Sequence, residues 1–229
     1  MDIKYNSLIK LDSVLLVYLD QKNNKQKLEL ISENGLQWMI PLSMHQKIEK
    51  NLDLYAFIIN KSFCICDPNC NSIYKVNNML FSKAEIKLDN KVKYIEIESS
   101  NTGKDFQINT FDIIDKTSVF SNLDIAICYK VNLKNITEDS IILFQIINPK
   151  GELHFLDFEC LKKNKVNGRR IYYAALKITP LLIEGKWIFQ LIYKDKIIDT
   201  KEVIYKIYKN DYGNRDYFTQ NYMNINIEV

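Results

Sequence analysis

The sequence predicts an all-β protein made of two tandem antiparallel β-sandwich domains. Three observations lead to this fold class: apolar and polar residues alternate with a period of two, the apolar runs are short, and turn residues separate them. The composition agrees, because Tyr, Phe, Ile and Val fit a half-buried sheet surface and the chain contains 14 Tyr and 11 Phe. At 229 residues the chain is long for one sandwich and sufficient for two domains of about 100 residues each.

The strand pattern is clearest in the C-terminal half. Apolar residues occupy one face of the segment 123–133, and the segment 141–147 is apolar on both faces, as expected for a central strand. A turn follows at 148–151, with proline at its second position and glycine at its fourth. Further strands are predicted at 153–158, 170–179, 187–193 and 197–208. Six or seven strands in about 95 residues is the spacing of a sandwich.

Two short motifs in this half resemble those of bacterial immunoglobulin-like and fibronectin-like domains. Asn148-Pro149-Lys150-Gly151 resembles the Pro-x-Gly of an early turn, and Gly185-Lys186-Trp187 resembles the Gly-x-Trp that begins the penultimate strand. The resemblance covers residues 115–210 and implies an immunoglobulin-like sandwich there. The cysteine pair of antibody-type domains is not evident, since Cys128 and Cys160 do not sit where that pair would be needed. The alternating register predicts that Trp187 lies in the core.

The N-terminal half is expected to form a second sandwich-like domain. Segments 11–19 and 28–42 are similar to 123–129 and 143–158 at an offset of about 112 residues, either because the halves are tandem copies or by chance. Further strands are predicted at 54–59, 63–66, 73–76, 84–88, 92–98 and 106–114. One helix is predicted over 43–51, with a serine cap.

The expected organisation is therefore two tandem immunoglobulin-like domains and a tail. We place the first domain at residues 1–114 and the second at 115–210. The polar tail, 211–229, is either loose or adds an edge strand.

Charge and hydropathy argue against several classes of protein. The net charge of +3 is too small for a dedicated nucleic-acid-binding protein. No stretch approaches the roughly 20 apolar residues of a membrane-spanning helix. Residues 1–5 lack the charged head, the apolar run and the cleavage site that are typical of a signal peptide. The five cysteines are odd in number and lack a framework spacing, which indicates a reducing compartment. We expect a soluble protein that is cytoplasmic or associated with a virion.

Three cysteines lie close together in the sequence, at Cys64, Cys66 and Cys70. With His45 as a fourth ligand they could bind zinc. Alternation, however, places Cys64 and Cys66 on one side of a strand, whereas a zinc knuckle uses a turn between paired cysteines. We therefore assign no metal site and interpret the cysteines as strand residues leading into an Asp-Pro-Asn turn. A redox role, the third alternative, would need a lowered thiol pKa.

The densest cluster of positive charge surrounds the turn expected at 166–168. It consists of Lys162, Lys163, Lys165, Arg169 and Arg170. Five cations on one loop could bind phosphate or another polyanion. The alternative is a solvated loop that blocks edge pairing, which three acidic residues between 152 and 159 favour.

Aromatic residues offer a further binding hypothesis. Sugar-binding modules stack saccharide rings on exposed aromatics, and Trp38, Tyr172, Tyr173 and Tyr208 are the candidate contacts. The sequence alone does not say which of these side chains face solvent.

Catalytic motifs are absent from the sequence. The only histidines are His45 and His154, and no nucleophile elbow, phosphate loop or dinucleotide glycine motif is present. We therefore expect a non-catalytic protein-interaction or structural module without a cofactor, which presents loops or an edge strand to a partner protein. A phage particle or a secretion apparatus would suit such a module. Carbohydrate binding through exposed aromatics and polyanion binding through residues 162–170 are the alternatives.

Overall fold

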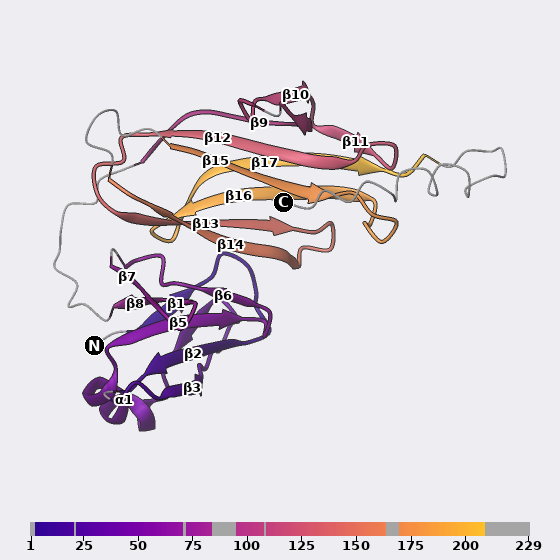
Figure 1. Ribbon diagram of the computed structural model, residues 1–229. Coiled ribbons are helices and arrows are strands. Elements are labelled where there is room, and N and C mark those ends of the chain that lie inside the picture. Colours follow the sequence, from indigo (N-terminus) through magenta and orange to yellow (C-terminus); the bar gives the residue numbers. More distant parts are fainter. Residues whose placement is uncertain are drawn as a thin grey trace.

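The computed structural model describes residues 3–20, 22–70, 72–83, 95–107, 109–163 and 170–208 (Figure 1). Within these ranges the chain forms four β-sheets, and every strand pair except one is antiparallel. The predicted all-β class is confirmed. The strands form a first unit, residues 3–83, and a second unit, residues 95–208, which lie against each other. None of the helices in the described ranges is long and apolar enough to cross a membrane.

The second unit is a sandwich of two sheets. One sheet has the order β10-β9-β12-β15, and the other has the order β11-β17-β16-β13-β14. The strands of the first sheet are β9 (Glu96–Phe106), β10 (Ile113–Lys116), β12 (Ala126–Lys134) and β15 (Arg170–Lys177). The strands of the second sheet are β11 (Val119–Ser121), β13 (Ser140–Ile147), β14 (Leu153–Leu161), β16 (Gly185–Tyr193) and β17 (Lys196–Lys206).

The connections identify this sandwich as immunoglobulin-like. The chain changes sheet between β12 and β13, between β14 and β15, and between β15 and β16. Strands β13, β16 and β17 then form the centre of one sheet, in the way that strands C, F and G do in an immunoglobulin domain, and β12 pairs with β15 as B pairs with E. The short strand β11 runs parallel to β17. The expected immunoglobulin-like fold of this half is confirmed.

The two motifs that carry the resemblance contact each other. Pro149 lies in the turn between β13 and β14, and Gly185 begins β16 with φ +133°. A Cβ atom on Gly185 would lie 2.8 Å from Cβ of Pro149, so a larger residue would not fit there. Trp187 follows, is 1% exposed, and donates from Nε1 to the carbonyl of Ile183 at 3.0 Å. Its predicted core position is therefore confirmed.

The first unit has a different strand order. Its six-stranded sheet runs β3-β2-β5-β8-β7, and β6 pairs with the far half of β5. The strands of this sheet are β2 (Val14–Leu19), β3 (Lys25–Glu29), β5 (Leu54–Ile59), β6 (Phe63–Ile65), β7 (Ile73–Val76) and β8 (Met79–Lys83). A two-stranded ribbon of β1 (Lys4–Asn6) and β4 (Gln37–Met39) packs on it, with the ring of Tyr5 5.2 Å from that of Phe57.

The helix expected at 43–51 begins slightly later. A 3-10 turn, η1 (Leu42–Met44), leads into α1 (His45–Asn51). Neither segment has a side-chain hydrogen bond at its N-terminus, so the expected serine cap is not formed. Burial of Ile48 in the core of the first unit holds this short helix against the sheet instead.

The strand pairing differs from the division expected between residues 114 and 115. Strand β9 pairs with β12 and β10 pairs with β9, so the chain from residue 96 onward belongs to the second sandwich. The offset repeat is not reflected in the pairing either, because β3 is an edge strand whereas β13 is central. The strand expected at 84–88 and the tail at 211–229 lie outside the described residues.

One apolar cluster joins the two units. The face of the second sheet that points away from its own sandwich contributes Ile141, Leu143, Leu156 and Ile192 to the core of the first unit. At the rim of this interface, the rings of Phe63 and Phe155 meet edge to face, with centroids 6.3 Å apart. The segment of β13 is therefore apolar on both faces because one face packs inside the sandwich and the other packs against the first unit.

Asp195 adds polar contacts to this interface. It lies in the turn between β16 and β17, and its Oδ2 accepts from Nδ2 of Asn6 at 2.9 Å and from Nδ2 of Asn69 at 3.0 Å. Replacing one acceptor would therefore leave two partly buried amides of the first unit without their bonds.

We expect Asp195→Ala to lower the free energy of unfolding by about 1–3 kcal/mol, because it removes both acceptor contacts at once. Urea unfolding monitored by tryptophan fluorescence measures this. Glu202→Ala on the same hairpin is the control: it removes one exposed ion pair to Lys186 at 3.1 Å, for which we expect a change of at most about 1 kcal/mol. Equal losses in the two variants would contradict the proposed importance of Asp195.

Candidate functional site

The structure does not bring the candidate zinc ligands together. Cys64 is exposed on β6, whereas Cys66 and Cys70 are buried. His45 is the first residue of α1, and its Nε2 lies 3.1 Å from the carbonyl of Ile40. Among the described residues, no group of three His, Cys, Asp or Glu side chains is placed to hold a metal ion. Burial raises the pKa of Cys66 to about 12, which keeps its thiol protonated.

The segment after Cys66 forms a hydrogen-bonded turn. Oδ2 of Asp67 accepts from the hydroxyl of Tyr55 at 2.5 Å, and its Oδ1 accepts from the amide of Asn69 at 2.8 Å. The thiol of Cys70 donates to the carbonyls of Ser72 and Lys83. Because Asn69 also reaches Asp195, this turn serves the interface between the units.

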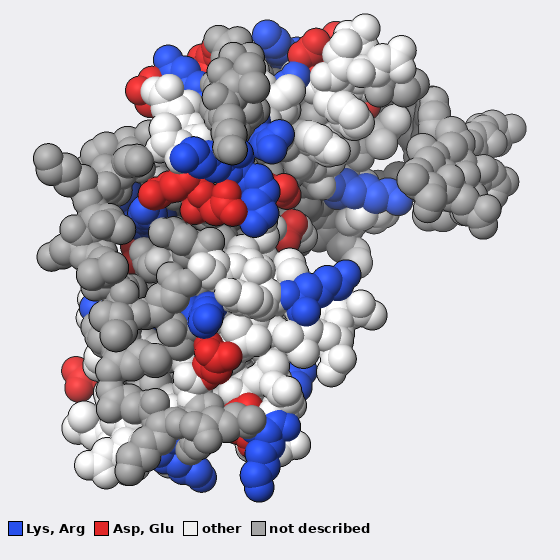
Figure 2. Space-filling view, turned by 60° about the vertical axis from the view of Figure 1, so that its left-hand side comes forward, with Lys and Arg blue, Asp and Glu red and all other residues white. Residues whose placement is uncertain are grey.

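Part of the basic cluster is engaged in local contacts. Nζ of Lys162 lies 2.9 Å from Oδ2 of Asp139, and the amide of Lys163 donates to Oδ1 of the same carboxylate at 2.8 Å. Arg170 begins β15, and Lys165 and Arg169 lie outside the described residues. Figure 2 shows basic and acidic side chains intermingled on the face that it displays. Lys162 and Lys163 of the basic cluster therefore share the carboxylate of Asp139 as a neighbour.

The four candidate sugar contacts do not form one platform. Trp38 and Tyr172 are buried, in the first and second unit respectively. Tyr173 is 48% exposed, but one face of its ring stacks on Phe111 with centroids 4.7 Å apart. Tyr208 is exposed beyond the end of β17. The structure thus distributes these aromatics over both units.

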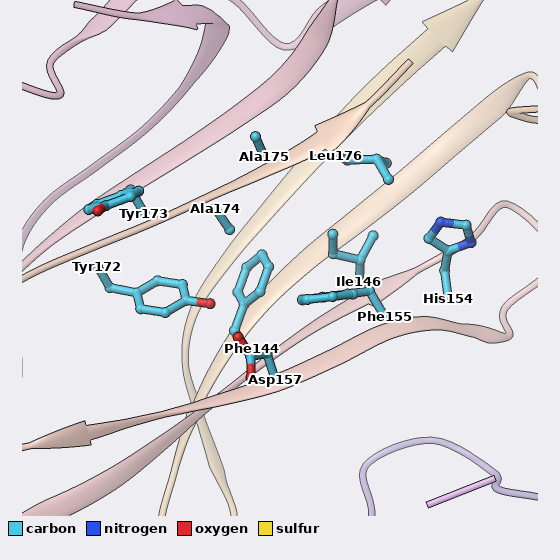
Figure 3. Close-up of a pocket in the computed structure, with 10 residues that line it drawn as sticks. All are labelled: Phe144, Ile146, His154, Phe155, Asp157, Tyr172, Tyr173, Ala174, Ala175 and Leu176. Atoms are coloured by element: carbon cyan, nitrogen blue, oxygen red, sulfur yellow. The ribbon is translucent and has the colours of Figure 1, made fainter. Parts of the chain in front are cut away.

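A pocket opens between the two sheets of the sandwich, where β14 and β15 are the edge strands. Its volume is about 210 Å³. Figure 3 shows Phe144 and Ile146 of β13, three residues of β14, and the segment 172–176 of β15 around it. The residues from β14 are His154, Phe155 and Asp157. Most of the lining is apolar, and Ala174 lies between Tyr172 and Leu176 in the wall that β15 provides.

The polar groups of this pocket do not form a catalytic arrangement. The ring of His154 meets Trp187 edge to face at 4.9 Å, and burial lowers the pKa of this histidine, which favours the neutral imidazole. Burial raises the pKa of Tyr172, so its hydroxyl also stays neutral. Within the described residues, no hydrogen bond joins His154 to Asp157. The pocket therefore offers an apolar surface with a few polar groups.

The outer side of β15 carries backbone groups that pair with no strand in the described part of the chain. The amide of Ile178 donates to the carbonyl of Ile125 at 2.9 Å, one step beyond the ladder pair Lys177–Ala126. Because bonded and non-bonded pairs alternate in an antiparallel ladder, the even-numbered residues of β15 bond to β12. Its odd-numbered residues direct their N–H and C=O groups away from β12, and within the described residues β15 has no second neighbour. These residues are Ile171, Tyr173, Ala175 and Lys177, and all four are exposed.

The side chains of β15 leave this edge unprotected. Edge strands usually carry charges that discourage pairing with other chains. Strand β3 does so with Lys25, Lys27 and Glu29, and β14 carries Asp157 and Glu159. In β15, by contrast, the segment 171–176 contains no charged residue, and Arg170 and Lys177 stand only at its ends. Among the edge strands that the structure describes, no other has six uncharged residues in succession.

The comparisons with known proteins add two likenesses. An immunoglobulin-like protein of Pseudomonas aeruginosa aligns with 49% of this chain and 97% of its own, at 13% identity and a TM-score of 0.35. A glycosyl hydrolase family 2 member from Bacteroides cellulosilyticus aligns with 87% of this chain at 9% identity and a TM-score of 0.31; the chain spans 27% of that enzyme's length. No family model and no curated protein matches the sequence. The strand order itself defines the class: this is a protein with an immunoglobulin-like β-sandwich.

The thiols provide a test of the metal hypothesis. We expect Cys64 to react with Ellman's reagent faster than Cys66, because Cys64 is exposed whereas Cys66 is buried and its pKa is raised to about 12. Cys64→Ser should remove one fast-reacting thiol from the native protein. Zinc bound to protein purified without chelator, together with protection of Cys64 that a chelator relieves, would contradict this expectation.

Proposed function

We propose that this protein is a non-catalytic interaction module that binds an extended segment of a partner protein at the free edge of β15. The observation that carries the proposal is the row of outward-facing backbone groups between Arg170 and Lys177, exposed and without a charge among the six residues between them. A partner strand would form main-chain hydrogen bonds there and extend the sheet β10-β9-β12-β15 by one strand.

The pocket beside this edge supports the same function. Alternate side chains of an added strand point to the same side as Tyr172, Ala174 and Leu176, and thus toward the apolar pocket of about 210 Å³. Main-chain bonds provide affinity that depends little on sequence, whereas a pocket for alternate side chains provides specificity. Such a site suits a component of a larger assembly, in which subunits are joined through shared sheets.

Ala175→Pro tests the edge selectively. The amide of Ala175 points away from β12, so proline there removes an outward donor and leaves the ladder to β12 intact. We expect the variant to remain folded, with a melting temperature within a few degrees of wild type, and to lose a partner that wild-type protein captures from lysate of the source organism in high salt. Mass spectrometry identifies the retained proteins.

Lys27→Pro is the matched control. Its amide also points away from its sheet, at the edge strand β3, because the bond from the amide of Leu30 to the carbonyl of Val14 sets the same alternation there. This variant should capture the partner as wild type does. Ala175→Lys is a second edge variant that keeps the backbone donor and adds a charge. Undiminished capture by both Ala175 variants would reject the β15 edge as the binding site.

A further inference from the structure

The pocket beside β15 combines aromatic rings with a carboxylate. The ring of Phe144 lies 5.3 Å from that of Tyr172 and 6.3 Å from that of Phe155, measured between centroids. Asp157 stands opposite Phe144 in the ladder between β13 and β14, so both side chains lie on the face that points into the sandwich. Figure 3 shows Asp157 beside Phe144, with the ring of Tyr172 directed toward them. The wall across the pocket from β15 therefore carries a negative charge next to aromatic surface.

The described residues leave this negative charge without a partner. Asp157 forms no hydrogen bond or ion pair within the described part of the chain. The lining includes no Lys or Arg, and burial lowers the pKa of His154, which favours its neutral form. Burial, together with the charges of Asp157 and Glu159, raises the pKa of Tyr172. The charge of these two carboxylates thus acts on the interior of the pocket.

Glu159 differs from Asp157 because a cation lies near it. Burial and the charge of Asp157 raise the pKa of Glu159, whereas the charge of Arg170 lowers it. Arg170 thus offsets part of the negative charge at that end of the strand pair. Asp157 is the carboxylate that lines the pocket itself, and its charge is therefore available to a ligand.

A long cationic side chain matches both features of the pocket. Cations are attracted to the faces of aromatic rings, and the aliphatic parts of Lys and Arg pack on apolar surface. Their charged groups form strong hydrogen bonds to carboxylates. Because packed sheets lie about 10 Å apart, only a long side chain that enters from the side of β15 reaches a carboxylate on β14. A neutral apolar side chain would cover Asp157 without pairing it, which costs free energy.

We propose that the pocket binds a lysine or arginine side chain of the partner strand. Its aliphatic part would pack between the rings of Phe144, Phe155 and Tyr172, and its charged group would pair with Asp157. This inference rests on the proposed function, because it names the side chain that a strand bound at the edge of β15 inserts. The basic residue would occupy the position beside Ala174, from which alternate side chains of an added strand point into the pocket.

The edge of a second copy would not supply this side chain. A β15 strand from another molecule would direct Tyr172, Ala174 and Leu176 to the side of the pocket, and its segment 171–176 contains no cation. The proposed partner is therefore a protein of different sequence, with Lys or Arg at an alternating position of an extended segment.

Titration of the full chain with two small probes tests the pocket without a partner strand. The probes are n-butylguanidinium chloride and 1-butanol, which share a butyl chain and differ in the cationic group. NMR signals of the methyl groups of Ala174 and Leu176 report binding. We expect the cation to bind about fivefold or more tightly than the alcohol, because only the cation gains from the rings and the carboxylate.

Asp157→Asn should abolish the preference for the cation, because the carboxamide keeps the shape of the side chain and removes its charge. Glu202→Gln is the matched control. It neutralises an exposed carboxylate on β17 that pairs with Lys186 at 3.1 Å and does not line the pocket, so the preference should persist.

Three results would overturn the proposal: equal or tighter binding of 1-butanol, methyl signals that neither probe shifts, or a preference for the cation that survives in Asp157→Asn. The titrations do not involve the outward backbone groups of β15. They can therefore fail while the capture experiment with Ala175→Pro succeeds, and the reverse. If both proposals hold, Asp157→Asn should capture several-fold less partner than wild type.

Discussion

Burial of β13 on both faces is the constraint on which the two units of this protein depend. Ile142, Phe144 and Ile146 point into the sandwich, where the rings of Phe144 and Tyr129 stack with centroids 5.2 Å apart. Ile141 and Leu143 point the other way and belong to the core of the first unit. Each unit thus uses the same strand as a wall of its core. Since a packed core transmits changes in volume to its neighbours, the first unit cannot shift on the sandwich without disturbing β13. The hydrogen bonds from Asn6 and Asn69 to Asp195 fix the orientation of the first unit on the sandwich, which the apolar contact alone would specify less well.

The sequence was informative where the physical cause is local. The period of two and the run of apolar residues in β13 indicate strands because side chains alternate across a sheet, and the turn at Pro149 and the glycine before Trp187 follow from backbone geometry. The contact between Pro149 and Gly185 explains why these two motifs occur together: the turn after β13 rests on the start of β16, and only glycine leaves space for it.

Other features could not be derived from sequence because they depend on which strands become neighbours. Periodicity predicts strands at 92–98 and 106–114, whereas the structure has one strand, β9, over Glu96–Phe106. Periodicity also does not say that β9 pairs with β12, so the division expected near residue 115 differs from the pairing. The same reason hid the candidate site. The sequence singled out Tyr172 and Tyr173 as aromatics. Their place in the structure depends instead on the alternation that turns one residue inward and the next outward, and on β15 having no second neighbour among the described residues. The one available signal was the absence of charge between Arg170 and Lys177, which becomes meaningful only for an edge strand.

The edge strands differ in the number of charged residues that they carry, and this difference is the main argument for the proposed function. An exposed edge without charges invites pairing with other chains, so a protein that gains nothing from such an edge is expected to protect it. Here β3 has charged residues at all three of its outward-facing positions, and β14, which borders the same pocket as β15, carries Asp157 and Glu159. The packing of the sandwich does not require an uncharged residue at Ile171, which is 54% exposed, whereas the ring of Tyr173 packs on Phe106 and Phe111. The strand that we propose to bind here would pair with backbone groups that have no partner strand among the described residues. The proposed function would account for the uncharged residues between Arg170 and Lys177 at this edge.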